Sequence, residues 1–198
     1  SIDTVYQRVL AFANKEQRGY ITPQDFNLFA SQVQMEILEQ YFYDINQFGR
    51  ALGNTTEHSD MLSEINEKVA IFKATMGLVD QFDPATQRSA IPPAVYKIGT
   101  LSHTRFGDGI GRVTFEELNY DEHMTRQASP LTAPTIKRPY FVNQNGFLEV
   151  FAGSNLTAAE MGLSFVRRPT PPNWAYVVVN GKTLYNDNVS ADFELHRS

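Results

Sequence analysis

The chain has 198 residues, with 17 Lys or Arg against 22 Asp or Glu, so its formal net charge is −5. A hydrophobic fraction of 42% and a charged fraction of 20% are typical of a folded soluble protein of one or two domains. The absence of cysteine excludes disulfide frameworks, cysteine–zinc sites and thiol nucleophiles. The acidic balance disfavours a protein that coats nucleic acid with a basic surface.

Helical spacing of apolar residues predicts three helices in the first part of the chain. The first runs from about Ile2 to Ala13, the second from Pro23 to about Phe48, and the third from about Ser59 to Lys73. Thr22 supplies an N-cap and Pro23 the first helical position of the long second helix. Its main apolar stripe is Phe26, Phe29, Val33, Ile37, Tyr41 and Ile45. Further apolar residues widen this stripe, so we expect the helix to be covered on more than one side.

After about Met76 the pattern changes to short β-type runs separated by turn residues. Two turns, Asn145-Gly146 and Asn180-Gly181, predict type I′ hairpins. One helix is expected within this half, opened by a capping box at Thr114–Glu117. The expected strands are Val95–Leu101, Arg112–Thr114, Pro139–Val142, Phe147–Phe151, Leu163–Val166 and Tyr176–Val179.

These patterns predict an α+β chain in two regions. Residues 1–75 form a bundle of three helices, and residues 76–198 form a small antiparallel β region with one inserted helix. The proline-rich segments 129–139 and 167–174 are expected to be extended arms that lie across a neighbour. Residues 1–80 hold 6 basic and 11 acidic side chains, so the excess of negative charge lies in the helical region.

No pattern of catalytic chemistry stands out in the sequence. Gly181-Lys182-Thr183 resembles the end of a phosphate-binding loop, but the glycine that should precede it is replaced by Tyr176, so the triplet indicates a hairpin turn. Glu116 and Glu117 indicate a helix cap rather than an acid–base pair. The four histidines share no metal-ligand spacing. We therefore expect no enzymatic activity, no cofactor and no metal, and no apolar run reaches the roughly 18 residues of a membrane helix.

Aromatic and basic residues are the candidates for contacts between subunits. Aromatic side chains cluster near the end of the long helix with the spacing of core or subunit packing. The Arg167-Arg168 doublet precedes a proline and is better suited to a surface or inter-subunit contact than to DNA phosphates. The candidate interface residues are Tyr41, Phe42, Tyr43, Phe48, Arg167, Arg168 and Trp174.

Several stretches together resemble a family of tailed-phage virion structural proteins, found in marine and crAss-like phages. The most specific is Asn14–Pro23, which leads into Phe26–Leu28 and Gln40–Asp44. Looser agreement follows at Arg138–Phe141, Phe147–Phe151, Phe165–Pro169, Trp174–Tyr176 and Asp192–His196. Members of this family are assigned to the neck as ring or head-to-tail connector proteins. The similar proteins continue past the last block into a terminal helix, so we expect further residues after Ser198.

The resemblance implies a non-enzymatic virion protein, assembled in the host cytoplasm, that forms a ring, expected to be a dodecamer, in the phage neck. Its partners would be its own copies, the portal protein and tail or other neck proteins, with genomic DNA passing through without sequence-specific binding and no membrane. The alternatives are a tail terminator or other tail component and, in a different class, a ligand-binding β module with a helical stalk. Such a module would use Trp174 and Tyr176 as its stacking surface.

Overall fold

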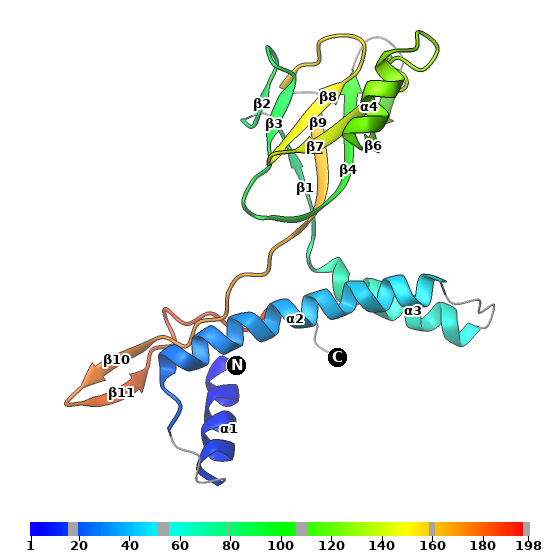
Figure 1. Cartoon of the computed structure of the whole chain (residues 1–198). Coiled ribbons are helices and arrows are strands. Elements are labelled where there is room, and N and C mark those ends of the chain that lie inside the picture. The colour runs from blue at the N-terminus through cyan, green and yellow to red at the C-terminus, as the bar shows by residue number, and fades with distance from the viewer. Residues whose placement is uncertain (16–19, 51–55, 79, 106–110, 159–160, 196–198) are drawn as a thin grey trace. The chain divides into compact units, whose positions relative to one another are not determined.

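The computed structural model describes residues 1–15, 20–50, 56–78, 80–105, 111–158 and 161–195, with the side chains of 48–50, 56–59 and 105 left out. It confirms the α+β class. The chain divides into two compact units, one made of Ser1–Ile71 with Pro169–Ser198 and the other of Phe72–Arg168 (Figure 1). Of the charged residues, 7 basic and 13 acidic belong to the first unit and 10 basic and 9 acidic to the second.

Three helices form the N-terminal part of the first unit, as the sequence predicts. They are α1 (Ile2–Lys15), α2 (Pro23–Arg50) and α3 (Thr56–Ala70), and α3 packs against α2 (Figure 1). Thr22 caps α2, because the backbone N–H of Asp25 donates to its Oγ1 at 3.2 Å.

The buried stripe of α2 differs from the predicted one. Phe26, Ala30, Gln34 and Leu38 are buried, whereas Phe29 and Val33 are exposed. The observed stripe follows strict i, i+4 spacing and includes a glutamine, which a search for apolar residues passes over. The second, exposed stripe accounts for the apolar width of the helix.

The C-terminal segment was expected in the β region but belongs to the helical unit. Gln34 holds both ends of this segment, because its Nε2 donates to the Thr170 carbonyl at 2.8 Å and its Oε1 accepts the Glu194 N–H at 2.9 Å. In addition, the N–H of Ile2 donates to Asp192 Oδ1 at 2.6 Å. Buried amide groups need such partners, so α2 can bury Gln34 only with both ends of this segment in place.

The same segment carries a two-stranded sheet. Strands β10 (Tyr176–Val179) and β11 (Lys182–Tyr185) pair antiparallel around Asn180-Gly181. Both turn residues have positive φ, 50° and 77°, which confirms the predicted type I′ geometry.

The second unit contains two sheets whose inward side chains form one core. The four-stranded sheet has the order β1-β9-β4-β5 and the five-stranded sheet the order β2-β3-β8-β7-β6. Leu101, Leu163 and Phe165 of the first sheet and Phe141 and Leu148 of the second belong to the same buried cluster. The strands are β1 (Lys73–Gly77), β2 (Phe82–Asp83), β3 (Arg88–Ala90), β4 (Val95–Arg105), β5 (Gly111–Thr114), β6 (Glu116–Leu118), β7 (Tyr140–Gln144), β8 (Phe147–Phe151) and β9 (Met161–Arg167).

The predicted helix of this half begins later than expected. Residues 114–117 lie in and between β5 and β6, and α4 is Tyr120–Gln127. The backbone N–H of Asn119 donates to Glu122 Oε2 at 3.3 Å, so Asn119 and Glu122 make the cap that was assigned to 114–117. Residues 116–118 instead pair with β7 in parallel, an exception to the expected antiparallel sheet. The segment from α4 to β7 supplies the crossover that parallel pairing needs.

The segment 129–139 was expected to be an arm across a neighbour, but it lies on its own unit. A one-pair bridge joins Thr135 and Arg138, and the Ile136 carbonyl is 3.2 Å from Nε2 of buried His103. The Pro134 carbonyl approaches the backbone of Gly153, which has φ 70°. A Cβ at this position would lie only 2.5 Å from the carbonyl oxygen, so the approach requires glycine. The bridge shapes the segment itself, and the contacts with His103 and Gly153 fix it against the rest of the unit.

Candidate interaction surfaces

An apolar groove lies on the first unit, between α1 and α2. The inner faces of the two helices meet through Ile2, Tyr6 and Phe26, which leaves the adjacent faces to form the groove. Its volume is about 210 Å³, and every residue that lines it is apolar. The lining residues are Val5, Val9, Ile21, Phe26, Phe29, Ala30, Val33 and Phe193. Phe29 is 60% exposed and Val33 is 46% exposed, so the groove is open to solvent.

The β10–β11 hairpin is the second apolar surface of this unit. Cross-strand pairing places Val177 opposite Leu184 and Val179 opposite Lys182 on one face, with Val178 and Thr183 on the other. Val177, Val178, Val179 and Leu184 are 46–59% exposed. An isolated two-stranded hairpin is marginally stable in water, so a hairpin with apolar residues on both faces is expected to need a neighbour.

Trp174 anchors the hairpin to the helices and is not a surface residue. It is only 3% exposed, and its ring stacks on Tyr176 and Tyr185 with centroids 5.8 and 5.7 Å away. Its Nε1–H donates to Asp3 Oδ1 at 2.9 Å. The ligand-binding alternative therefore loses its proposed stacking surface, and Trp174 does not offer the subunit contact that we predicted.

Tyr6 completes this aromatic core. Its ring lies 4.3 Å from that of Trp174 and 4.9 Å from that of Phe26, and its hydroxyl donates to the Ile21 carbonyl at 3.3 Å. Burial, followed by the nearby Tyr20 hydroxyl, raises the pKa of Tyr6 well above its usual range. The phenol therefore stays neutral, as a buried packing group should.

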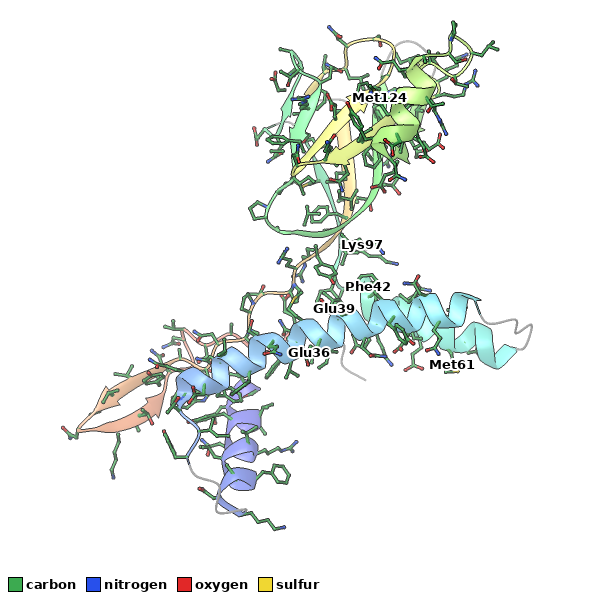
Figure 2. All side chains as sticks on the ribbon, viewed as in Figure 1. Glu36, Glu39, Phe42, Met61, Lys97 and Met124 are labelled. Carbon is green, nitrogen blue, oxygen red and sulfur yellow. The ribbon has the colours of Figure 1, made fainter. Side chains whose placement is uncertain are left out.

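The predicted aromatic cluster on α2 is only partly exposed. Tyr41 and Phe42 are half-buried, Tyr43 is 60% exposed, and the Phe48 side chain lies outside the described residues. Figure 2 shows Phe42 on α2 and Met61 on α3. Tyr43 is thus the member of this cluster whose exposure best suits a contact between subunits.

The two arginines belong to the end of the second unit and have different surroundings. The Arg167 guanidinium stands 5.7 Å from the Phe72 ring centroid, a cation–π contact, and its backbone N–H donates to the Phe72 carbonyl. The backbone N–H of Arg168 donates to the Ala94 carbonyl at 2.8 Å, and its side chain is exposed. Arg168 is therefore available for a partner, whereas Arg167 already stabilises its own unit.

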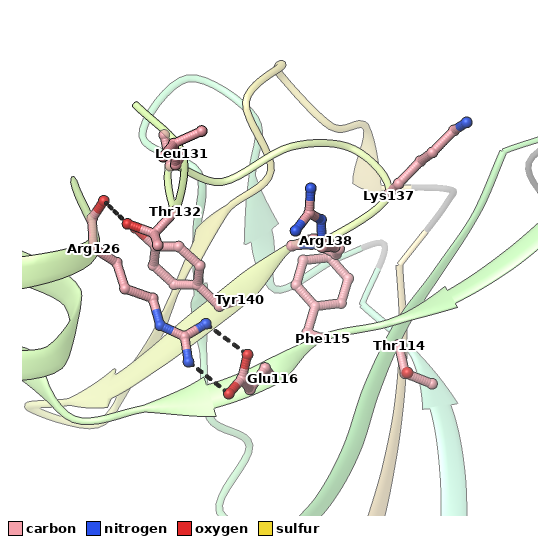
Figure 3. Close-up of a pocket in the computed structure, with 11 residues that line it drawn as sticks. Thr114, Phe115, Glu116, Arg126, Leu131, Thr132, Lys137, Arg138 and Tyr140 are labelled. Atoms are coloured by element: carbon pink, nitrogen blue, oxygen red, sulfur yellow. Dashed lines mark hydrogen bonds and ion pairs between the residues drawn. The ribbon is translucent and has the colours of Figure 1, made fainter. Parts of the chain in front are cut away.

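A hollow of about 340 Å³ in the second unit is lined in part by charged side chains, two of which form an ion pair (Figure 3). Arg126 Nη1 and Nη2 donate to the two carboxylate oxygens of Glu116 at 2.7 and 2.8 Å. This bidentate pair lowers the pKa of Glu116 and raises the pKa of Arg126. Lys137, at the rim, points away from the pair (Figure 3). Glu116 is therefore committed to an ion pair and not poised as an acid or base.

A second hollow, of about 480 Å³, has aromatic walls and holds another ion pair. His123 stacks on Phe151 with centroids 4.2 Å apart, and its Nδ1 is 3.2 Å from the Tyr140 hydroxyl. Arg88 Nη2 donates to Glu149 Oε1 at 2.9 Å. Within the described residues, no three His, Asp or Glu side chains gather as metal ligands. None of the helices in the part of the chain described here is long and apolar enough to cross a membrane.

Comparison with known proteins adds no family to these observations. No protein-family model matches the chain, and no curated protein sequence matches it either.

The two apolar surfaces of the first unit could be predicted only in part from the sequence. The width of the apolar face on α2 indicated a second covered side, but the groove depends on the packing of α1, and the hairpin's exposed face depends on Trp174.

Proposed function

We propose that this chain is a non-enzymatic subunit of a ring in the neck of a tailed phage, where it joins the portal to the tail. The proposal comes from the sequence blocks that resemble phage neck proteins. The structural observation that supports it best is the unfilled apolar surface of the first unit. A groove lined only by apolar side chains and an apolar hairpin lie on one unit.

Contiguous exposed apolar surface on one unit marks a site of association, because water is unfavourable next to it. A subunit packed between neighbours would use such surface on two sides. In a closed ring the contacts are heterologous, meaning that one surface of each copy meets a different surface of the next. The groove and the hairpin are two different surfaces of this kind.

The charge of the first unit is consistent with a passage for DNA. Its 13 acidic side chains outnumber its 7 basic ones. Negative charge repels phosphates and would let genomic DNA pass without being held.

Electron microscopy of purified virions that contain this protein tests the proposal. We expect its density in a ring between the portal and the tail. Density in the tail tube or at the tail end would favour the tail-component alternative, and density in fibres or the capsid shell would overturn the neck assignment. Imaging of particles that lack the protein provides the control, with heads that fail to join tails as the expected result.

A further inference from the structure

We propose that the β10–β11 hairpin of one copy docks its outward face into the α1–α2 groove of a second copy. The inference rests on the proposed function in one respect, since it takes the neighbour in the assembly to be the same chain. It names the two surfaces and the direction of the contact, which the resemblance does not supply.

The two faces of the hairpin differ in what covers them. Tyr176 and Tyr185 form a cross-strand pair, and both stack on Trp174, so their face turns toward the core of the unit. Side chains alternate along a strand, so Val177, Val179 and Leu184 turn the opposite way. Val177, Val179 and Leu184 are 46–53% exposed, and Val178, beyond the two tyrosines on the other face, is 59% exposed.

The groove matches this face in chemistry and size. The groove has a volume of about 210 Å³ and only apolar side chains line it, so apolar side chains of the hairpin can enter it. Val177 and Val179, two residues apart on one strand, are spaced by roughly 7 Å. Phe29 and Val33, one helical turn apart on the groove wall, are spaced by roughly 6 Å. Two hairpin side chains can therefore enter beside two helix side chains.

Charged residues at the hairpin tip and beside the groove determine which way round the hairpin lies in the groove. Lys182 carries the only charge between Tyr176 and Tyr185 and lies at the tip of the outward face. On α2, Glu36 follows Val33 by three residues and thus lies on the same side of the helix. Its carboxylate accepts a bond from Gln32 Nε2 at 2.8 Å and is exposed. On α1, Arg8 holds the corresponding position after Val5, and its like charge would repel Lys182.

A second copy fits the groove better than the hairpin of the same chain. Trp174 and Tyr6 tie the hairpin to the core next to the groove, and the outward face turns away from that core. A contact between a hairpin and the groove of another copy leaves one hairpin and one groove free, so it repeats. A repeating heterologous contact gives a ring when the rotation closes.

The experiment uses the full chain and two complementary variants. Val179→Asp removes the hairpin surface but leaves the groove, and Val33→Asp removes the groove surface but leaves the hairpin. We expect the wild-type chain to form concentration-dependent oligomers in sedimentation velocity, and each variant to associate at least tenfold more weakly. A mixture of the two variants has one intact contact, so we expect it to form heterodimers and nothing larger.

Charge reversal tests the orientation. Lys182→Glu and Glu36→Lys should each weaken association, and the double variant should recover it to within about threefold of wild type. Thr183→Glu, on the inward-turned face next to Lys182, is the matched control and should leave association unchanged. The emission of Trp174, the only tryptophan, verifies that each variant keeps the first unit folded.

A wild-type chain that stays monomeric at every concentration overturns the docking proposal, and so does a mixture that forms no heterodimer. Oligomers that persist in both aspartate variants also overturn it, because a different surface would then hold them together. None of these outcomes bears on the neck assignment, which virion imaging decides. Conversely, heterodimers from the mixture would stand even if the protein were located elsewhere in the virion.

Discussion

Replacing Tyr6 by alanine should destabilise the first unit strongly. The ring is 2% exposed and lies between Phe26 and Trp174, with centroids 4.9 and 4.3 Å away. Removing a buried aromatic ring leaves a cavity and typically costs about 3–5 kcal/mol of unfolding free energy. For a unit of roughly 100 residues, each kcal/mol lowers the melting temperature by about 4–8 °C, so we expect a fall of at least about 12 °C.

Tyr6→Phe removes the hydroxyl and keeps the ring, so it measures the contribution of the hydroxyl alone. This variant keeps both aromatic contacts and loses only the 3.3 Å bond to the Ile21 carbonyl. We expect a loss of about 0.5–1.5 kcal/mol, which is the usual net value of such a bond. Urea unfolding followed by Trp174 emission reports on the first unit directly, because no other tryptophan contributes. A loss below about 1 kcal/mol for Tyr6→Ala, or wild-type emission typical of an exposed indole, would refute the packing of this core.

The second unit gives two further predictions. Gly153→Ala should destabilise it by more than about 1 kcal/mol in chemical unfolding, since φ is 70° and the new Cβ would meet the Pro134 carbonyl. Gly146→Ala is the control, with φ 79° and nothing within 4 Å, and should cost less. In the pH dependence of unfolding, the pKa of Glu116 is lowered by Arg126, so the pair stabilises the fold above the unfolded-state pKa of about 4.3. This contribution is lost as the pH falls through the folded-state pKa, so Glu116→Gln should lower stability at neutral pH, match wild type at low pH and thereby flatten the acid limb; an unchanged acid limb would contradict this.

Local signals in the sequence were sufficient for the three N-terminal helices and for the two Asn-Gly hairpins. Asn145-Gly146 and Asn180-Gly181 determine their turns because few residue pairs tolerate positive φ twice in succession. The long helix follows from a cap at Thr22 and an uninterrupted apolar pattern. Each of these elements depends on residues that are close together in the chain.

The cap at 114–117 shows why a local signal can be wrong. Both Thr114–Glu117 and Asn119–Glu122 have the spacing of a capping box. The choice between them depends on residues 116–118 pairing with β7, more than 20 residues further along the chain. Strand pairing is a long-range contact, and no feature of the segment itself records it.

The division into units could not be read from the sequence for a similar reason. Gln34 lies among apolar residues on α2, where a glutamine suggests a break in the stripe. It is buried because the two ends of the C-terminal segment satisfy both its donor and its acceptor. The prediction therefore placed residues 169–198 with the strands they resemble and not with the helix they bind.

The run Val177-Val178-Val179 indicates a strand, and its composition also indicates that neither face of the strand is suited to water. A strand with one covered face alternates apolar and polar residues, and three successive valines depart from that alternation. In the structure Trp174 stacks on Tyr176 and Tyr185 of one face, whereas Val178 on the same face is exposed. The other face carries Val177, Val179 and Leu184 with Lys182, and its three apolar side chains are exposed. A two-stranded sheet that is apolar on both faces is thus best explained if its own chain packs on one face and a neighbouring chain packs on the other. The apolar groove beside α2 of a second copy has the size and polarity to pack on that other face.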